Sequence, residues 1–360
     1  MLLLIKKILI AIVVILVIAV GVLFAIKLVK EKNKGEDQVI SLGTDTLGKQ
    51  DEEKTKQDVN IFSGDDRPIA IMIDNHKGAL PQAGLNDAYI VYEIIVEGGE
   101  TRLMEVLKGK NLEKVGPIRS SRHYFLDYAL ENDAIYVHYG WSPQAQYDIS
   151  NLGVNNINGI SESESSFWRV KDKRAPHNVA TSTAKILSIA ERKGYKTTST
   201  KKSVLNYVTD EVELTDGQNA EKITIPYSYS NDVEYTYDAT TKRYQRYSKG
   251  VKETDWSTGE NITTKNIIIT FAKNSVLNDG ENKDRQTLSN VGTLNGYYIT
   301  NGKAIKITCE KTSRSAQTVY KDLDGNEIKV NDGNTYVQIC PINAKVTIEG
   351  AEETVTEDVD

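Results

Sequence analysis

The chain has 360 residues, 39% of them hydrophobic and 26% charged, which is enough for about two folded domains with ordinary cores. Its formal net charge is −6, but positions 1–34 hold six lysines and one glutamate, so the remainder has 38 basic and 49 acidic residues. A body this acidic argues against general nucleic-acid binding, which requires a basic face.

The first expected element is a membrane span at positions 8–26, which form an uninterrupted apolar run. About 20 helical residues cross the hydrocarbon core of a bilayer, and this run is too long for the apolar part of a signal peptide. We therefore expect a transmembrane anchor within residues 1–30, followed by a flexible polar linker over 31–60. Lysines flank both ends of the run, so charge alone does not fix its orientation.

Residues 61–200 alternate apolar strand patterns with helix patterns, which predicts an α/β or α+β N-terminal domain. Serine or threonine before the helix patterns and glycine after them supply the expected caps. The expected strands lie at 69–74, 89–96, 103–108, 114–118 and 134–140, and the expected helices start near Ser120 or Ser121, at Ser142 and at Thr183.

Residues 201–350 consist of short β-type runs separated by Gly, Asn and Asp, which predicts a β-rich C-terminal domain. An acidic tail follows at 351–360. The chain's two cysteines, Cys309 and Cys340, fall in expected strands of this domain. They are either two separate buried thiols or, if their strands are neighbours in an oxidising compartment, a disulfide.

Candidate functional residues gather at the expected strand ends of the first domain. GPIRSSR (116–122) combines arginines with a helix start, and both guanidinium groups and helix N-termini bind anions. We predict Glu97 and His138 as catalytic proton-transfer groups, and Arg102, Arg119, Ser120, Arg122, His177 and Asn178 as ligand-binding residues.

Each candidate also has a structural interpretation: serines cap helices, arginines pair with surface carboxylates, and histidines are hydrogen-bonded in a core. No nucleophile motif, nucleotide-binding loop or metal-ligand spacing is present, so we expect neither a cofactor nor a metal. The residues leave open whether the protein is an enzyme.

Several motifs occur in an order that resembles a known family. They are RPIAIMIDN (67–75), LPQAGLNDAYIVYE (80–93), VEGGETR (96–102), VGPIRSSR (115–122), HYGWSPQA (138–145), APHN (175–178) and DLDGNEIKVNDGNTYVQI (322–339). This series resembles the YerB-like lipoprotein family of Gram-positive bacteria, a two-part domain of unknown function, over roughly residues 62–345.

The resemblance implies an exported protein whose body lies outside the cytoplasm. The family's signature residues correspond here to Glu97, Arg102, Arg119, Arg122, His138 and His177. The chain departs from the family pattern because it has the apolar run and no N-terminal lipid-acceptor cysteine, so lipid attachment is not carried over.

Two functions are compatible with these features. The first is binding or processing of an anionic cell-envelope ligand by residues 61–200, in a single-pass membrane protein with an extracytoplasmic body. The second is a non-enzymatic scaffold that contacts an envelope protein or the membrane through residues 201–350, which the lack of a nucleophile or cofactor motif favours.

Overall fold

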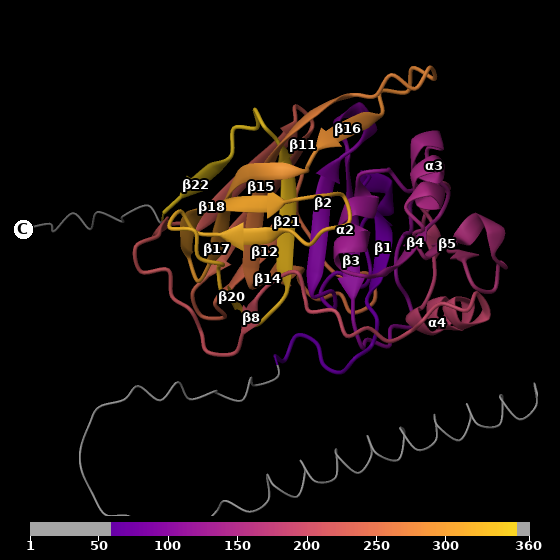
Figure 1. The fold of residues 1–360 in the computed structure, drawn as a ribbon, viewed down its shortest axis with the longest axis horizontal. Helices are drawn as coiled ribbons and strands as arrows, with labels where there is room; N and C mark the ends of the chain where they lie inside the picture. Colours follow the sequence, from indigo (N-terminus) through magenta and orange to yellow (C-terminus); the bar gives the residue numbers. More distant parts are fainter. Residues whose placement is uncertain (1–58, 351–360) are drawn as a thin grey trace, which may run out of the picture. The chain divides into compact units, whose positions relative to one another are not determined.

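The computed structural model describes residues 59–350, which lie within one compact unit built around a 12-stranded mixed sheet (Figure 1). Along the main path of the sheet the strands are β19 (Val319–Lys321), β18 (Lys303–Lys311), β17 (Gly292–Thr300), β15 (Asn266–Val276), β21 (Thr335–Pro341), β2 (Ile90–Ile95), β3 (Thr101–Leu107), β1 (Ile69–Asp74), β4 (Ile135–His138) and β5 (Asn156–Asn158). Off this path, β16 (Gln286–Ser289) pairs with β15, and β9 (Gln218–Asn219) pairs with β18.

A second, six-stranded sheet packs on one face of the large sheet. It contains β13 (Val251–Lys252), β12 (Arg243–Ser248), β11 (Asn231–Asp238), β10 (Lys222–Ser228), β22 (Thr347–Glu349) and β14 (Thr263–Thr264). Alternate residues of β10 and β11, such as Ile223 and Val233, are buried in one hydrophobic cluster with Ile71 and Val91 of the large sheet. The alternation follows from the two-residue period of a strand, which sends every second side chain to the same face.

Three short helices cover the part of the large sheet that contains β1–β5. Helix α4 (Thr183–Arg192) packs through Ile186 and Ile189 on the same face as the second sheet. Helices α2 (Phe125–Glu131) and α3 (Pro143–Asn151) cover the opposite face, where Phe125 and Ile149 share a cluster with Met72. The shorter elements are η1 (Lys77–Ala79), η2 (Glu97–Gly99), η3 (Gly159–Ser161), β6 (Trp168–Arg169), β7 (Val179–Ala180), β8 (Tyr207–Val208) and β20 (Val330–Asn331).

The expected fold class, an α/β or α+β N-terminal domain followed by a β-rich C-terminal domain, with one N-terminal transmembrane helix, is wrong. Strand β2 pairs in parallel with β21, so residues 61–200 and 201–350 contribute to one continuous sheet. Local patterns identify strands, but they do not encode which distant strands pair. Within residues 59–350, no helix is long and apolar enough to cross a membrane. The expected span at 8–26 lies outside the described residues, as do the acidic tail and nearly all of the linker.

Local predictions fared better than long-range ones. Helix α3 begins as expected, with the Ser142 side chain accepting a hydrogen bond from the backbone N of Ala145 at 3.2 Å. Helix α4 also lies where it was predicted. The expected strand at 114–118 is instead an irregular segment with isolated β-bridges, and the helix expected to follow it begins only at Phe125. The two cysteines are buried as separate thiols on β18 and β21.

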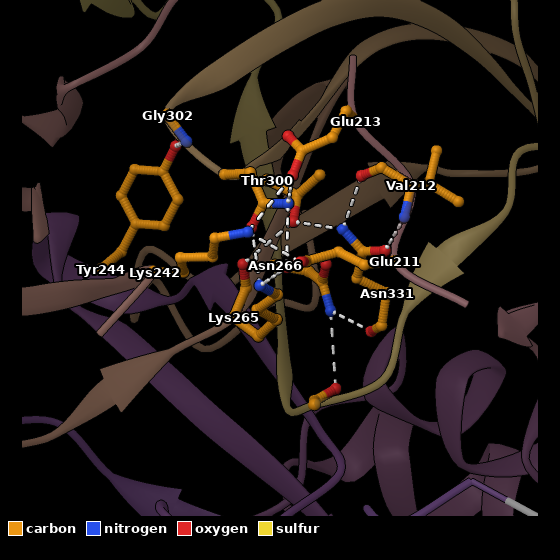
Figure 2. Close-up of polar contacts among 12 residues, drawn as sticks. Glu211, Val212, Glu213, Lys242, Tyr244, Lys265, Asn266, Thr300, Gly302 and Asn331 are labelled. Carbon is orange, nitrogen blue, oxygen red and sulfur yellow. Dashed lines mark hydrogen bonds and ion pairs between the residues drawn. The ribbon is translucent and has the colours of Figure 1, made fainter. Parts of the chain in front are cut away.

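Side-chain hydrogen bonds secure the segment between β8 and β9, which connects the helical part of the chain to the second sheet. Figure 2 shows Lys265 and Lys242 donating to the two carboxylate oxygens of Glu211, each at 2.7 Å. These hydrogen bonds lower the pKa of Glu211 to about 2. Asn331 accepts from the backbone N of Val212 at 2.7 Å and donates to its carbonyl at 2.9 Å. Both the N–H and the C=O of Val212 are therefore hydrogen-bonded, which holds this irregular segment in place.

A buried charge network centred on Arg246 joins the two sheets. The side chain of Arg246 is fully buried; its Nε donates to Glu253 at 2.6 Å and its Nη1 to the hydroxyl of Tyr235 at 3.1 Å. Its Nη2 lies 3.1 Å from Oε2 of Glu93 on β2, an ion pair without hydrogen-bond geometry. Burial raises the pKa of Glu253, although the charge of Arg246 opposes this shift. The guanidinium also lies 5.3 Å from the ring centre of Tyr336 on β21.

Replacing Arg246 alone should destabilise the protein strongly. Arg246→Leu leaves Glu93 and Glu253 buried without a counter-charge, and breaking a buried pair in this way costs about 3–5 kcal/mol. We expect urea unfolding to show a loss of this size, and the triple variant with Glu93→Gln and Glu253→Gln to recover much of it. Lys283→Ala, a change at an exposed ion pair, is the control. Equal stability of Arg246→Leu and this control would contradict the assigned role.

Candidate functional site

The carboxyl ends of three strands meet at one edge of the large sheet. Strand β1 is parallel to β4, and β3 is antiparallel to both β1 and β2, so β1, β2 and β4 all run in the same direction. Asp74 is the last residue of β1, and Glu97 begins the short η2 turn that follows β2. Arg102, near the start of β3, stands opposite Asp74 in the register. Ligands of open sheets commonly bind beyond such carboxyl ends.

Glu97 holds two arginines together at this edge. Nε of Arg122 donates to Oε1 of Glu97, and Nη2 of Arg102 lies 3.5 Å from Oε2. Burial alone would raise the pKa of Glu97, but the hydrogen bond and charge of Arg122 and the charge of Arg102 outweigh it and lower the pKa. Arg285, from the segment between β15 and β16, approaches the same carboxylate at 4.0 Å.

Arg102 and Arg122 also donate hydrogen bonds to the backbone of the irregular segment between β3 and α2. Arg102 donates to the carbonyl of Ser120, and Nη1 of Arg122 donates to the carbonyl of Ser121 at 2.7 Å. Burial lowers the pKa of Arg102 to about 10, and the positive charges of Arg122 and Arg119 act in the same direction. Guanidinium groups are therefore crowded here, and a bound anion would relieve their repulsion.

Asp74 is the residue of this site that the sequence analysis missed. Its Oδ2 lies 2.7 Å from Nδ1 of His177 and 3.3 Å from Nε of Arg119, while Oδ1 accepts from the backbone N of His76 at 3.1 Å. The side chain of Asp74 is 4% exposed, compared with 25% for Arg119 and 17% for His177. The available signal was its position, as an acidic residue that ends an apolar strand beside the predicted arginines.

His177 is held by ring stacking as well as by Asp74. Its imidazole lies parallel to that of His76, with ring centres 4.2 Å apart and an interplanar angle of 10°. Burial, followed by the charge of His177, lowers the pKa of His76. A Cβ at Gly78 would stand 3.3 Å from both rings, so a side chain there would press on the stack.

Two predicted site residues do not face this cluster. The buried His138 has Nδ1 2.8 Å from the carbonyl of Gly140 and Nε2 3.2 Å from Oδ1 of Asn156, and burial lowers its pKa to about 4. These contacts fit a structural histidine rather than the predicted catalytic group. Asn178 donates to the carbonyl of Val170 at 3.1 Å, which fixes the segment carrying His177.

The remaining six predicted residues come together. Arg102, Arg119, Ser120, Arg122, Glu97 and His177 form one group through the contacts above. Ser120 takes part through its carbonyl and does not cap α2, whose N-cap residue is Tyr124. We call Asp74, Glu97, Arg102, Arg119, Arg122 and His177 the arginine cluster.

Comparisons with known proteins confirm the family resemblance. Models described as "Protein of unknown function (DUF3048)", for its N-terminal and C-terminal domains, match residues 55–196 and 223–337. "Putative lipoprotein YerB" of Bacillus subtilis (strain 168) is 32% identical over 296 residues, which is 80% of this chain and 84% of that protein. The crystal structure of the YerB protein from Bacillus subtilis is similar with a TM-score of 0.71 at 30% identity, covering 81% of this chain and 97% of that one.

The structural role of His138 predicts a specific pH dependence. The unfolded chain binds a proton at this residue near the ordinary pKa of 6.5, whereas the folded chain binds it only near 4, so the free energy of unfolding falls as the pH drops through this window. The loss from this one group is about 3 kcal/mol in total. Urea unfolding of His138→Gln between these pH values should show a shallower decline than the wild type. Parallel curves would mean that His138 is not buried in its neutral form.

Proposed function

The chain belongs to the DUF3048 family, and we propose that it binds an anionic cell-envelope ligand at the arginine cluster, on the extracytoplasmic side of the membrane. The observation that carries this proposal is the convergence of three guanidinium groups on two carboxylates. Arg102 and Arg122 share Glu97, and Arg102 stands opposite Asp74, the partner of Arg119. The three arginines therefore lie in one group rather than on separate surfaces.

The charge balance of the cluster favours an anion. Among the six members of the arginine cluster, the guanidinium groups of Arg102, Arg119 and Arg122 face the carboxylates of Glu97 and Asp74, which leaves one guanidinium in excess. Arg119 is the most exposed of the three, and within residues 59–350 its only polar side-chain contact is the one from Nε to Asp74. Its terminal nitrogens can therefore donate a two-pronged pair of hydrogen bonds, which matches the geometry of phosphate or carboxylate.

The cellular location in this proposal rests on the relative. The Bacillus subtilis relative is named "Putative lipoprotein YerB", and lipoproteins are held at a membrane by their lipid. Phosphate- and carboxylate-bearing polymers are accessible to an extracytoplasmic body, and the acidic surface of this one suits a local anion site rather than general polyanion binding.

The exposed surface of residues 203–350 supports the scaffold alternative less well than the arginine cluster supports ligand binding. The large exposed apolar side chains of residues 203–350 include Tyr229, Val251, Val276, Leu323 and Ile342, and they belong to different turns and strand ends. Single exposed apolar residues are normal on folded proteins, whereas a docking surface needs a contiguous patch. The arginine cluster therefore supports ligand binding more directly than these residues support docking.

Arg119→Gln should weaken phosphate binding. The variant removes a charge and two available donors, and hydrogen bonds to charged groups are worth about 1.5–3 kcal/mol, so we expect the affinity measured by titration calorimetry to fall about ten- to a hundredfold. Arg192→Gln is the matched control, because it makes the same change at an exposed pair with Glu162. Equal phosphate affinities of the two variants would remove Arg119 from the site.

The proposed extracytoplasmic location of the folded body can be tested separately. If the body is extracytoplasmic, protease added to intact protoplasts should degrade residues 59–350, because no membrane separates them from the enzyme. Immunoblotting with antibodies against the body measures the loss, and a cytoplasmic protein serves as the control for intact cells. Protection of the body until lysis would reverse the orientation and place wall ligands out of reach.

A further inference from the structure

We propose that Asp74 and His177 form a proton-transfer pair that makes the arginine cluster a phosphoester hydrolase site. This inference rests on the anion site proposed above and names its substrate class. It also replaces His138 as the candidate general base, because His138 is buried with both ring nitrogens occupied. In this proposal the general base is His177, which contacts Asp74 at the carboxyl end of β1.

The geometry of the pair defines which nitrogen of His177 is available. Nδ1 lies 2.7 Å from Oδ2 of Asp74, and a carboxylate oxygen is an acceptor, so Nδ1 carries the proton and donates it. Nε2 then presents a lone pair. In the part of the chain that the structure describes, no hydrogen bond reaches Nε2, and the side chain is 17% exposed. A carboxylate that orients a histidine in this way is the arrangement used for general-base catalysis.

Several contacts hold the imidazole in one orientation. The ring of His76 stacks on it at 4.2 Å, and the backbone N of His76 is itself bound to Oδ1 of Asp74. At the next residue along the chain, Asn178 donates to the carbonyl of Val170 and accepts from Arg169 at 2.7 Å, which fixes the backbone beside His177. A catalytic base needs such positioning, because proton transfer is efficient only at hydrogen-bond distance and in the right direction.

The base and the anion-binding arginine share one oxygen atom. Arg119 and His177 both contact Oδ2 of Asp74, so their side chains meet at a single point. An anion held by the terminal nitrogens of Arg119 would therefore bind close to the imidazole, because both side chains contact the same carboxylate oxygen. The structure thus combines charge stabilisation and a general base in one place.

The reaction balances without any further reagent. A water oxygen attacks phosphorus, and its proton passes to Nε2 of His177 as the new P–O bond forms. The P–O bond to the ester group breaks, and the departing oxygen keeps the bonding electron pair. That oxygen receives a proton from the imidazolium, or leaves as a stable anion while the imidazolium releases its proton to solvent. Arg119 and its neighbours neutralise the charge that builds on the phosphoryl oxygens.

The test uses bis(p-nitrophenyl) phosphate as the probe and the release of p-nitrophenolate as the readout. The wild type should hydrolyse the probe. His177→Gln should reduce kcat at least about a hundredfold, because general-base catalysis contributes about 10²–10⁴ in rate. His123→Gln is the matched control and should keep the rate, because the ring of His123 lies outside the cluster and contacts Thr287 and Tyr124.

A chemical measurement checks the position of the anion independently of turnover. Diethyl pyrocarbonate acylates unprotonated imidazole nitrogens, and peptide mass spectrometry locates the product. Inorganic phosphate should slow modification at His177 but not at His123 if the anion sits beside Nε2. Modification of His177 that phosphate leaves unchanged would separate the base from the anion and overturn the inference.

Calorimetric titration of the same variants with inorganic phosphate separates the two proposals. His177→Gln should bind phosphate nearly as well as the wild type, since Arg119 remains. A wild type that binds phosphate but does not hydrolyse the probe, or an equal rate in His177→Gln, would refute the hydrolase and leave the anion site standing. A wild type that neither binds phosphate nor turns over the probe would refute both.

Discussion

The parallel pairing of β2 with β21 is the constraint on which the rest of the molecule depends. It runs from Ile90 opposite Thr335 to Ile94 opposite Ile339 and joins strands from opposite ends of the folded chain. Because β15 is parallel to β21 in turn, the carboxyl ends of all these strands lie at one edge. Only this alignment lets Arg285, from the segment after β15, approach Glu97, from the turn after β2. The Arg246 network then holds the second sheet against β2 of the large sheet through Glu93.

The sequence carried enough information to predict most local elements but not their assembly. Ser142 and Pro143 identify the start of α3 because capping depends on neighbouring residues alone. Arg246 lacked any local signal, since an arginine in a polar strand pattern reads as a solvated residue. Its full burial arises from Glu93, which is supplied by a strand of the other sheet. Burial of a charge is thus a property of tertiary pairing, which a single sequence does not display.

The site shows the same division between local and long-range information. Strand-end position was sufficient to select Glu97, Arg102, Arg119 and Arg122, because parallel strands bring such positions together at one edge. Strand-end position could not show which of His138 and His177 lies in the site, because both stand next to turn residues. His138 is enclosed by packing against the rings of Tyr136 and Trp141, and this packing is not visible in the sequence. Asp74 gave no separate signal because it ends a strand of apolar residues, a pattern that predicts burial in a core.

The central place of β21 also governs how the chain can reach its native state. Among the strands of residues 59–350 only β22 is synthesised later than β21, yet β21 fills the gap between β15 and β2. Until it arrives, those two strands each present an open row of backbone donors and acceptors, the kind of edge that invites aggregation. The segments matched by the two family models, 55–196 and 223–337, therefore depend on each other to fold. A chain interrupted shortly before residue 335 would carry every member of the arginine cluster and still lack the strand that holds its two halves in register.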